Sequence, residues 1–409
     1  MSTGRRLGAI VAGGAASRFG ADKAMAEWRG RPLISLAAAT LAPWCDALVV
    51  AGVLGLVASS LHVGLGSAGA VVTAYSLTYA LSAVLLGSVT GHLPRKQLLL
   101  LALLLFALGN LGAALAPNFV LLLLARVVSA VGASLFTPVA SGVAAALVPP
   151  ELRGRALALT FVGIPVATVL GVPLGTWIGG ALGWRSAFWL VVGLSVVALA
   201  GVALLVRPVT VARPTTHWLG LLRRPALAQA LLVMLFLYVG QFAVYPYLAP
   251  MLHGFTGLNT LGITLMLLWC GLAGLVGNAL GGRLTDLWSG PRTLLMGLGL
   301  TAAGLFLLTI FASSVWGVGL ALALWGMGTL ATNAPQQSQV VGLTPVAPGV
   351  ALSLNASALY LGQALGSTLG GVFAGSHLAE LGWVGGVAVL IAAALALRPA
   401  RRTSSLAAD

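Results

Sequence analysis

The sequence predicts an all-α membrane protein built from two six-helix bundles related by a pseudo-twofold repeat. Hydrophobic residues make up 59% of the 409 residues and charged residues only 7%, and the mean hydropathy is +1.04. A soluble protein of this length carries several times more charge. Apolar runs of about 20 residues, the length of a helix that crosses a bilayer, recur along the chain. One glycine-rich stretch also occurs twice, so two similar halves are expected.

The repeated stretch spans residues 155–189, where glycine and proline recur within an apolar run. These residues weaken a helix in water. In a bilayer no water competes for backbone hydrogen bonds, so such a helix persists, and its small residues let a second helix approach closely. Gly171 and Gly175 recur 195 residues later as Gly366 and Gly370. We therefore predict a tightly packed transmembrane helix in each half.

Twelve membrane spans are expected from the apolar runs. The six spans of the first half lie at 33–62, 67–89, 97–115, 119–147, 156–181 and 186–206. The six spans of the second half lie at 227–252, 259–281, 293–312, 315–341, 350–374 and 381–397. This divides the chain into a segment 1–32, a bundle 33–206, a linker 207–226, a bundle 227–397 and a tail 398–409. The first span is atypical because Pro43 predicts a kink and Asp46 places a carboxylate in the membrane.

The formal net charge of +14 arises from basic residues in short loops between the spans. They gather in the loops after even-numbered spans, in the linker and in the tail, at Arg95, Lys96, Arg153, Arg155, Arg207, Arg213, Arg223, Arg224, Arg283, Arg292, Arg398, Arg401 and Arg402. Positive loops stay in the cytoplasm, so the chain is expected to be a multi-pass inner-membrane protein with both termini cytoplasmic. Membrane topology explains this charge better than nucleic-acid binding does.

Cofactor and metal sites are not expected. Cys45 and Cys270 lie in apolar runs, without the spacing of a disulfide framework or of metal ligands. The expected partners are a small-molecule substrate, protons and the lipid bilayer, with the chain acting as a monomer.

The first 32 residues differ from the rest because they are polar and glycine-rich. A short apolar run is followed by a motif typical of phosphate-binding loops, made of Gly13, Gly14, Ser17, Arg18, Phe19, Gly20, Asp22, Lys23 and Ala24. Together with a strand-like run at 46–50, this motif resembles the start of the molybdenum cofactor guanylyltransferases over about the first 50 residues. Such an enzyme needs a full α/β domain, whereas a piece this short cannot bury a core. We therefore expect an orphan cytoplasmic segment and no enzyme, with the junction at 49–52.

A second resemblance covers roughly residues 50–397. The two-bundle plan and the loop from Gly87 to Lys96, which includes Arg95, are similar to the major facilitator superfamily. The family's usual Asp-Arg pair is replaced here by Gly91 and His92. The equivalent loop in the second half keeps an acid, with Gly282, Asp286 and Arg292. The resemblance implies that these loops gate the two halves through charge contacts, while plain positive-inside anchoring explains Arg95 and Lys96 equally well.

Coupling residues are suggested at two further places. Arg126 in the fourth span is followed by small residues, as in a motif of this family, and an arginine at that depth costs a few kcal/mol unless it meets a partner or water. It either serves proton or substrate coupling or snorkels to the membrane edge. The run from Gly171 through Pro173 to Gly175 resembles the family's antiporter motif, with close helix packing as the alternative. Asp46 is the one candidate proton carrier in the first span.

The resemblance also implies that spans one, four, seven and ten line the substrate path. The polar candidates on these spans are Ser129, Tyr238, Gln241, Tyr245, Thr332, Asn333, Gln336 and Gln337. Each could instead bridge neighbouring helices.

The predicted function is secondary active efflux of drug-like or sugar-like small molecules, by proton antiport and alternating access. Three alternatives stay open: an uptake permease of the same fold, a transport-defective chimera with a damaged first span, and a membrane-tethered guanylyltransferase, which would require GTP binding by residues 1–46.

Overall fold

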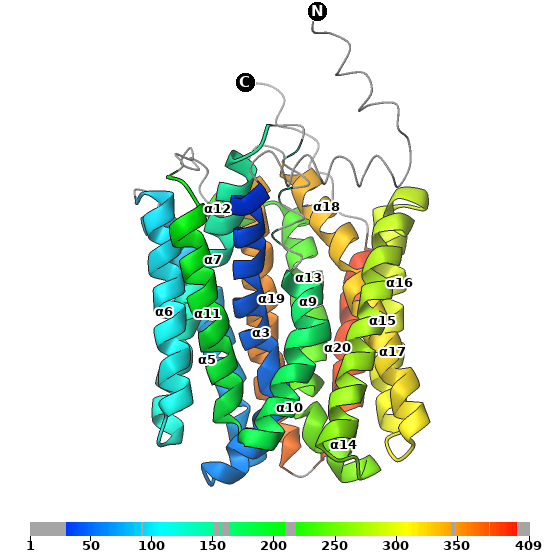
Figure 1. Cartoon of the computed structure of the whole chain (residues 1–409). Coiled ribbons are helices and arrows are strands. Elements are labelled where there is room, and N and C mark those ends of the chain that lie inside the picture. Colours follow the sequence, from blue (N-terminus) through cyan, green and yellow to red (C-terminus); the bar gives the residue numbers. More distant parts are fainter. Residues whose placement is uncertain are drawn as a thin grey trace, which may run out of the picture.

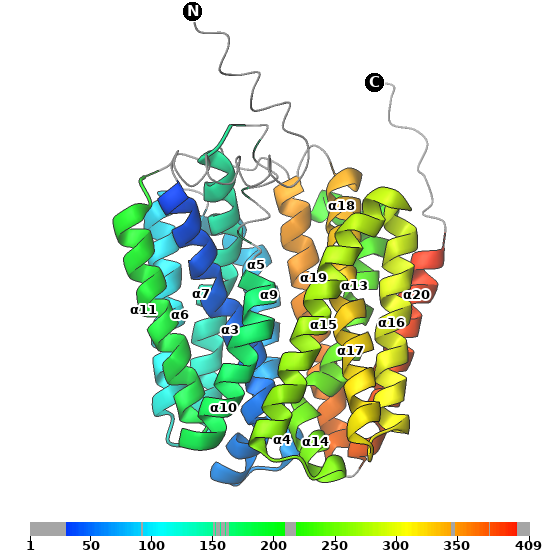
Figure 2. The ribbon, with the colours of Figure 1, turned by 45° about the vertical axis from the view of Figure 1, so that its right-hand side comes forward.

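The computed structural model describes residues 30–90, 93–149, 163–208, 218–344, 348–375 and 377–398, together with Leu152, Ala156 and Thr160. In this part of the chain the regular structure is helical and contains no strand. The long helices run up and down beside one another, and α3 (Gly30–Ser60) begins at the end of the bundle where α20 (Leu381–Leu397) finishes (Figures 1 and 2).

The helices of the first half follow the predicted spans closely. They are α3, then α4 (Leu65–Ala68) with α5 (Ala70–Val89), α6 (Arg95–Leu115), α7 (Phe119–Ala146), α9 (Gly163–Val166) continued by a π-helix η3 (Ala167–Gly171) and α10 (Val172–Leu182), and α11 (Arg185–Leu205).

The second half begins with the short α12 (Trp218–Leu222). It continues with α13 (Pro225–Val244), a 3-10 turn η4 (Tyr245–Tyr247) and α14 (Leu248–Thr256), then α15 (Thr260–Leu287), α16 (Gly290–Ile310), α17 (Val315–Ala331) with α18 (Asn333–Leu343), α19 (Pro348–Ala374), the 3-10 turn η5 (Leu378–Glu380) and α20.

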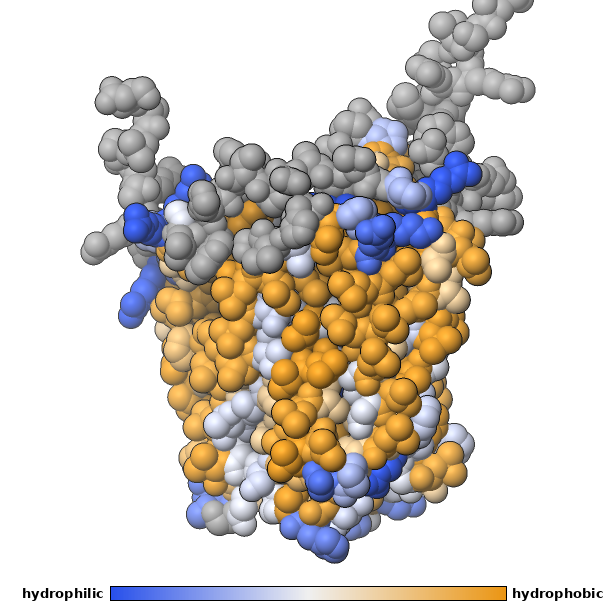
Figure 3. Space-filling view, turned by 90° about the vertical axis from the view of Figure 1, so that its left-hand side faces the viewer, coloured by the Kyte–Doolittle hydropathy of each residue, from blue (hydrophilic) through white to orange (hydrophobic). Residues whose placement is uncertain are grey.

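These helices confirm the predicted fold class. Among the described residues, 11 helical segments are long and apolar enough to cross a membrane. The remaining predicted span, 350–374, coincides with the 27-residue α19. Figure 3 shows a broad apolar band across the face in view, with hydrophilic residues at its two ends. The boundaries between the five predicted segments of the chain stay a prediction.

One resemblance does not hold. The strand-like run at 46–50 and the expected junction at 49–52 both lie inside the single helix α3, which follows the predicted first span at 33–62. A lone strand has no partner for its backbone groups in a bilayer, whereas a helix pairs them within itself. The phosphate-loop-like motif at residues 13–24 lies outside the described residues.

The repeated glycines form close contacts between helices. Side chains added at Gly171 and Gly175 would collide with Cys45 and Val49 of α3, and Gly179 packs in the same way on Val53. The second half repeats the contact with other partners. There, Gly366 and Gly370 of α19 pack directly on the backbone of α13 around Val239 and Ala243. The glycine pattern thus allows the same pair of helices to pack closely in each half: the fifth span on the first, and the eleventh span on the seventh.

The π-helix keeps the first glycine row in phase. Gly163 faces Thr40 of α3, and Gly171, eight residues later, faces Cys45. Eight α-helical residues rotate through roughly 800°, about 80° more than two full turns. The wider turn of η3 rotates less per residue and removes this excess, so both glycines meet the same helix.

We predict that Gly366→Leu destabilises the protein, because its side chain would enter the backbone of α13, which has no room to yield. Overpacking of this kind costs about 1–3 kcal/mol. Thermal unfolding of the purified protein in detergent measures the effect as a lower Tm. Gly193→Leu is the matched control, since a side chain added at Gly193 meets nothing within 4 Å. Equal Tm values for the two variants would contradict the packing role of the glycine.

Candidate functional site

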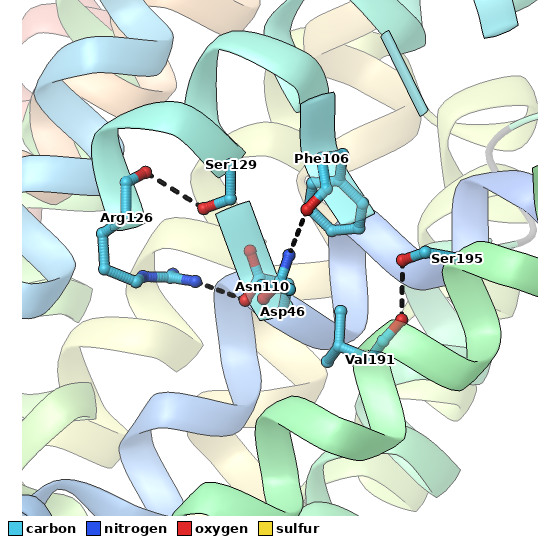
Figure 4. Close-up of polar contacts among 7 residues, drawn as sticks. All are labelled: Asp46, Phe106, Asn110, Arg126, Ser129, Val191 and Ser195. Carbon is cyan, nitrogen blue, oxygen red and sulfur yellow. Dashed lines mark hydrogen bonds and ion pairs between the residues drawn. The ribbon is translucent and has the colours of Figure 1, made fainter. Parts of the chain in front are cut away.

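A buried ion pair links the first and fourth spans. The Arg126 guanidinium of α7 donates through Nη1 to Oδ1 of Asp46 on α3 (Figure 4). Arg126 is 1% exposed and Asp46 is fully buried. Within the described parts of the chain this is the only ion pair. The two residues were separate predictions, and the structure brings them together. Arg126 therefore points into the bundle and does not snorkel to the membrane edge.

The surroundings of the pair hold it in place. The guanidinium carbon of Arg126 lies 4.3 Å from the ring centroid of Tyr75 and 5.6 Å from that of Phe188. Such cation–π contacts strengthen when water is excluded. Asn110 of α6 lies beside Asp46 in Figure 4 and donates from Nδ2 to the Phe106 carbonyl at 3.0 Å.

The pair is incompletely satisfied. Oδ2 of Asp46 and Nε of Arg126 are buried and make no hydrogen bond to any described residue. A buried ion pair offsets its desolvation cost only when its remaining polar atoms also find partners. Oδ1 of Asp46 therefore holds Arg126, while Oδ2 makes no hydrogen bond of its own and the Asn110 side chain lies beside the carboxylate.

The second half has a neutral counterpart of this contact. Gln241 of α13 lies 195 residues after Asp46 and is also buried, with 6% exposure. Its Oε1 accepts a hydrogen bond from Thr329 Oγ1 of α17 at 3.2 Å, and its Nε2 has no partner among the described residues. Spans one and four are thus joined by opposite charges, whereas spans seven and ten are joined by a neutral hydrogen bond.

Several other predicted cavity residues make local or bridging contacts. The Ser129 hydroxyl donates to the Arg126 carbonyl at 3.0 Å within α7. Thr332 Oγ1 donates to the carbonyl of Thr329 at 2.7 Å. Gln336 donates to the Ala230 carbonyl at 2.8 Å and contacts Asn355 Oδ1 at 3.4 Å, so it ties α18 to α13 and α19. Asn333 and Gln337 are half-buried on α18.

The two predicted tyrosines of span seven belong to an aromatic row. Tyr238 stacks on Phe242 with ring centroids 6.1 Å apart, and Phe242 lies 5.5 Å from Tyr245. Tyr245 in turn meets the edge of Trp325 at 6.1 Å. Span seven thus contacts α17 both through Tyr245 of η4 and through the polar side chain of Gln241 on α13.

Sequence reasoning missed a second aromatic group, which we call the aromatic cluster: Trp44, Tyr75, Tyr79 and Tyr360. Tyr79 and Tyr360 stack across the two halves with centroids 3.6 Å apart and planes inclined by 22°. Trp44 stacks on Tyr360 at 6.4 Å, and Tyr75 lies 6.3 Å from Tyr360. The four-residue spacing of Tyr75 and Tyr79 places both on one helix face, a signal visible in the sequence. Their partner on α19 was not visible there.

The predicted gating loops make few charge contacts in the described residues. Lys96 donates from Nζ to the Ala203 carbonyl at 2.7 Å, which ties α6 to α11. Asp286 and Arg292 are exposed, and neither forms an ion pair within the described residues. Gly87 lies in the last turn of α5, and Gly282 lies within α15. A charge lock between the halves therefore stays a prediction.

The two halves meet tightly at the end of the bundle opposite to the start of α3, where α4 and α14 lie (Figure 2). The Tyr247 hydroxyl donates to the Ser367 carbonyl at 2.8 Å, and Ser367 Oγ donates to the Gly69 carbonyl at 3.0 Å. A side chain at Gly66 would collide with the backbone at Gly371. Close backbone packing at Gly66 and the hydrogen bond to Gly69 thus hold α4 and the start of α5 against α19 at this end.

Comparison with known proteins places residues 33–408 in one family. A family model described as Major Facilitator Superfamily matches residues 33–366 and 230–408. The chain is 34% identical to an uncharacterized MFS-type transporter, YbcL, of Bacillus subtilis, over 84% of this chain and 89% of the relative. It is 31% identical to a chloramphenicol resistance protein of Streptomyces lividans, over 88% and 94% of the two chains. It is also 31% identical to a probable sugar efflux transporter of Helicobacter pylori, over 84% and 88%.

A solved structure shares the fold. The bacterial homologue of the human lysosomal transporter Spinster, in an inward-facing and occupied conformation, superposes with a TM-score of 0.73 at 17% identity, over 89% of this chain and 95% of that chain.

The comparisons correct the first resemblance. The family match begins at residue 33, inside the stretch compared with guanylyltransferases, and that comparison finds no support. The first span therefore belongs with the rest of the helices.

We predict that Arg126→Gln strongly destabilises the protein, because it leaves the Asp46 carboxylate buried without its charged partner. Breaking a buried pair in this way costs about 3–5 kcal/mol. The double variant Asp46→Asn with Arg126→Gln should recover most of the loss, since two amides can bond to each other without charge. Thermal unfolding of the single and double variants measures the coupling. Arg292→Gln, at an exposed position, is the control, and independent, additive effects at Asp46 and Arg126 would refute the pairing.

Proposed function

This chain belongs to the Major Facilitator Superfamily, and on that premise we propose that it exports small organic molecules through the cell membrane in exchange for protons. It is a multi-pass membrane transporter and not an enzyme. The buried pair of Asp46 and Arg126 carries the proton-exchange part of the proposal.

The proton step uses Oδ2 of Asp46. A proton arriving at Oδ2 neutralises the carboxylate and removes most of its attraction for Arg126. The α3–α7 contact then weakens, and Arg126 needs a new partner. Loss of the proton restores the pair, so the protonation state selects between two arrangements of the first bundle.

The direction of transport is proposed from relatives. Two relatives of similar length are named for sugar efflux and for chloramphenicol resistance. Uptake by the same fold is the alternative, and no contact of the described residues favours it. The chimera alternative loses its support because α3 is continuous and supplies Asp46 to the pair.

Alternating access is proposed to occur between the two bundles. The glycine contacts and hydrogen bonds of α4 and α5 with α19 close one end. The other end of the bundle is the one where α3 starts. Basic loops near this end favour a cytoplasmic position for it. Tyr238, Gln241 and Tyr245 are proposed to face the path, with Gly282, Asp286 and Arg292 as part of the gate. The transporter is proposed to work as a monomer.

Proton coupling can be measured in everted membrane vesicles with chloramphenicol as the probe. Respiration acidifies the vesicle interior, and we expect accumulation that collapses when nigericin removes the pH gradient. The double variant Asp46→Asn with Arg126→Gln should lose accumulation but keep exchange of labelled for unlabelled probe. Glu380→Gln, in η5, is the control with one acid removed elsewhere. Accumulation that ignores the gradient would exclude proton antiport.

Closure between the halves can be tested by cross-linking. The side-chain oxygens of Thr73 and Thr368 lie 3.1 Å apart, so cysteines at both positions are within disulfide reach. In a background where Cys45 and Cys270 are replaced by alanine, we expect Thr73→Cys with Thr368→Cys to cross-link and to stop transport. A reducing agent should restore transport, and either single cysteine should leave it unchanged. Full transport in the cross-linked protein would refute separation of the halves at this place.

A further inference from the structure

We propose that the aromatic cluster is the substrate site and that it takes neutral, planar aromatic molecules that carry hydrogen-bond acceptor oxygens. This inference rests on the proposed export function and names the substrate class. The cluster draws on both bundles, with Trp44 from α3, Tyr75 and Tyr79 from α5, and Tyr360 from α19. A molecule bound there contacts both halves, which a carrier requires if binding is to influence their movement.

The stacked pair of Tyr79 and Tyr360 indicates a planar ligand. Their centroid separation of 3.6 Å and inclination of 22° describe two flat faces in contact across the boundary between the bundles. When the bundles separate there, each ring exposes a flat face toward the other. An aromatic ligand that enters between them replaces one stacking contact with two. In this structure the two stacked rings of Tyr79 and Tyr360 therefore occupy the space that the ligand would take.

Unpartnered polar atoms set the hydrogen-bonding character of the ligand. Trp44 Nε1 and the Tyr75 hydroxyl are buried and make no hydrogen bond to a described residue, although Tyr75 is only 1% exposed. Buried indole and phenol groups normally find partners, and leaving a donor unpaired costs free energy. Acceptor oxygens on a ligand would satisfy these groups.

The charge balance favours a neutral ligand. Asp46 is the acid of the buried region, and Arg126 already neutralises it. Arg126 also occupies a face of the Tyr75 ring at 4.3 Å, so that face is closed to a cationic ligand. The described residues of the cluster supply no free carboxylate to balance a positive charge.

The walls around the cluster favour an aromatic ligand over a sugar. The three tyrosine rings of the cluster pack in one apolar group with small residues that include Ala42, Ala47, Ala130 and Ala133. The polar side chain nearby on α5, Ser76, already donates to Gln363 Oε1 at 3.1 Å. A sugar needs many donors and acceptors, whereas this lining offers few and mostly donors.

Equilibrium binding to the purified full-length protein in detergent tests the proposal with three labelled probes. Chloramphenicol is the neutral nitroaromatic probe, tetraphenylphosphonium is a lipophilic cation, and methyl β-galactoside is a sugar. We expect chloramphenicol to bind most tightly. Tyr75→Phe, which keeps the ring and loses the hydroxyl, should weaken its binding about fivefold, the value of one hydrogen bond. Tyr360→Leu should weaken it about tenfold through the lost stacking.

Trp44→Phe and Trp184→Phe form a matched pair, because both tryptophans carry a buried indole N–H without a described partner. Trp184 lies in the turn between α10 and α11, and its described ring contacts are with Phe188 and Arg185 rather than with a ring of the aromatic cluster. Only Trp44→Phe should weaken chloramphenicol binding. The Tm of each variant checks its folding.

Three results would overturn the site: no chloramphenicol binding by the wild-type protein, tighter binding of the cation or the sugar, or equal losses in Trp44→Phe and Trp184→Phe. The vesicle assay separates this inference from the export function. Export of chloramphenicol that the cluster variants leave unchanged would refute the site and keep the function. Binding with the expected variant pattern but without export would refute the function and keep the site.

Discussion

Neutralisation of the Asp46 carboxylate by Arg126 is the contact on which the arrangement of the first bundle depends. Neither charge can stay buried alone, because desolvation of one uncompensated ion costs several kcal/mol. The pair therefore fixes α3 against α7, places Asn110 beside the carboxylate and sets the guanidinium on the ring of Tyr75. Through Tyr75 it also touches the aromatic cluster, so the charged pair and the boundary between the bundles share one side chain.

The two halves are alike in packing and unlike in polarity. Glycine rows seat α9 to α10 on α3 and α19 on α13 in the same manner. The charged link of Asp46 and Arg126 has only a neutral equivalent in Gln241 and Thr329. Packing is required of both bundles by the shared fold, whereas a buried charge is costly and appears in one. We infer that proton-dependent change begins in the first bundle and that the second bundle follows through the shared boundary.

Hydropathy located the helices well because membrane spans need long apolar runs whatever their neighbours are. The glycine repeat likewise predicted close helix packing from the sequence alone. Contacts between residues far apart in the chain could not be predicted in this way. Asp46 and Arg126 are 80 residues apart, and each was considered by itself. Tyr79 and Tyr360 meet because α5 packs against α19, which no local pattern records. The strand-like run at 46–50 lies within the predicted span 33–62, and the bilayer-length apolar run rather than the short motif decides its structure.

The π-helix η3 (Ala167–Gly171) sets the rotation of the fifth span and also offers a way to change it. A wide turn can travel along a helix by exchanging one backbone hydrogen bond at a time. Each residue it passes turns by a fraction of the 100° that separates α-helical neighbours, while the rest of the helix keeps its bonds. The fifth span therefore has a way to twist its middle against α15, where Gly271 lies close to the Thr168 carbonyl. Movement between the bundles could then pass along this helix as a change of register and need no bend.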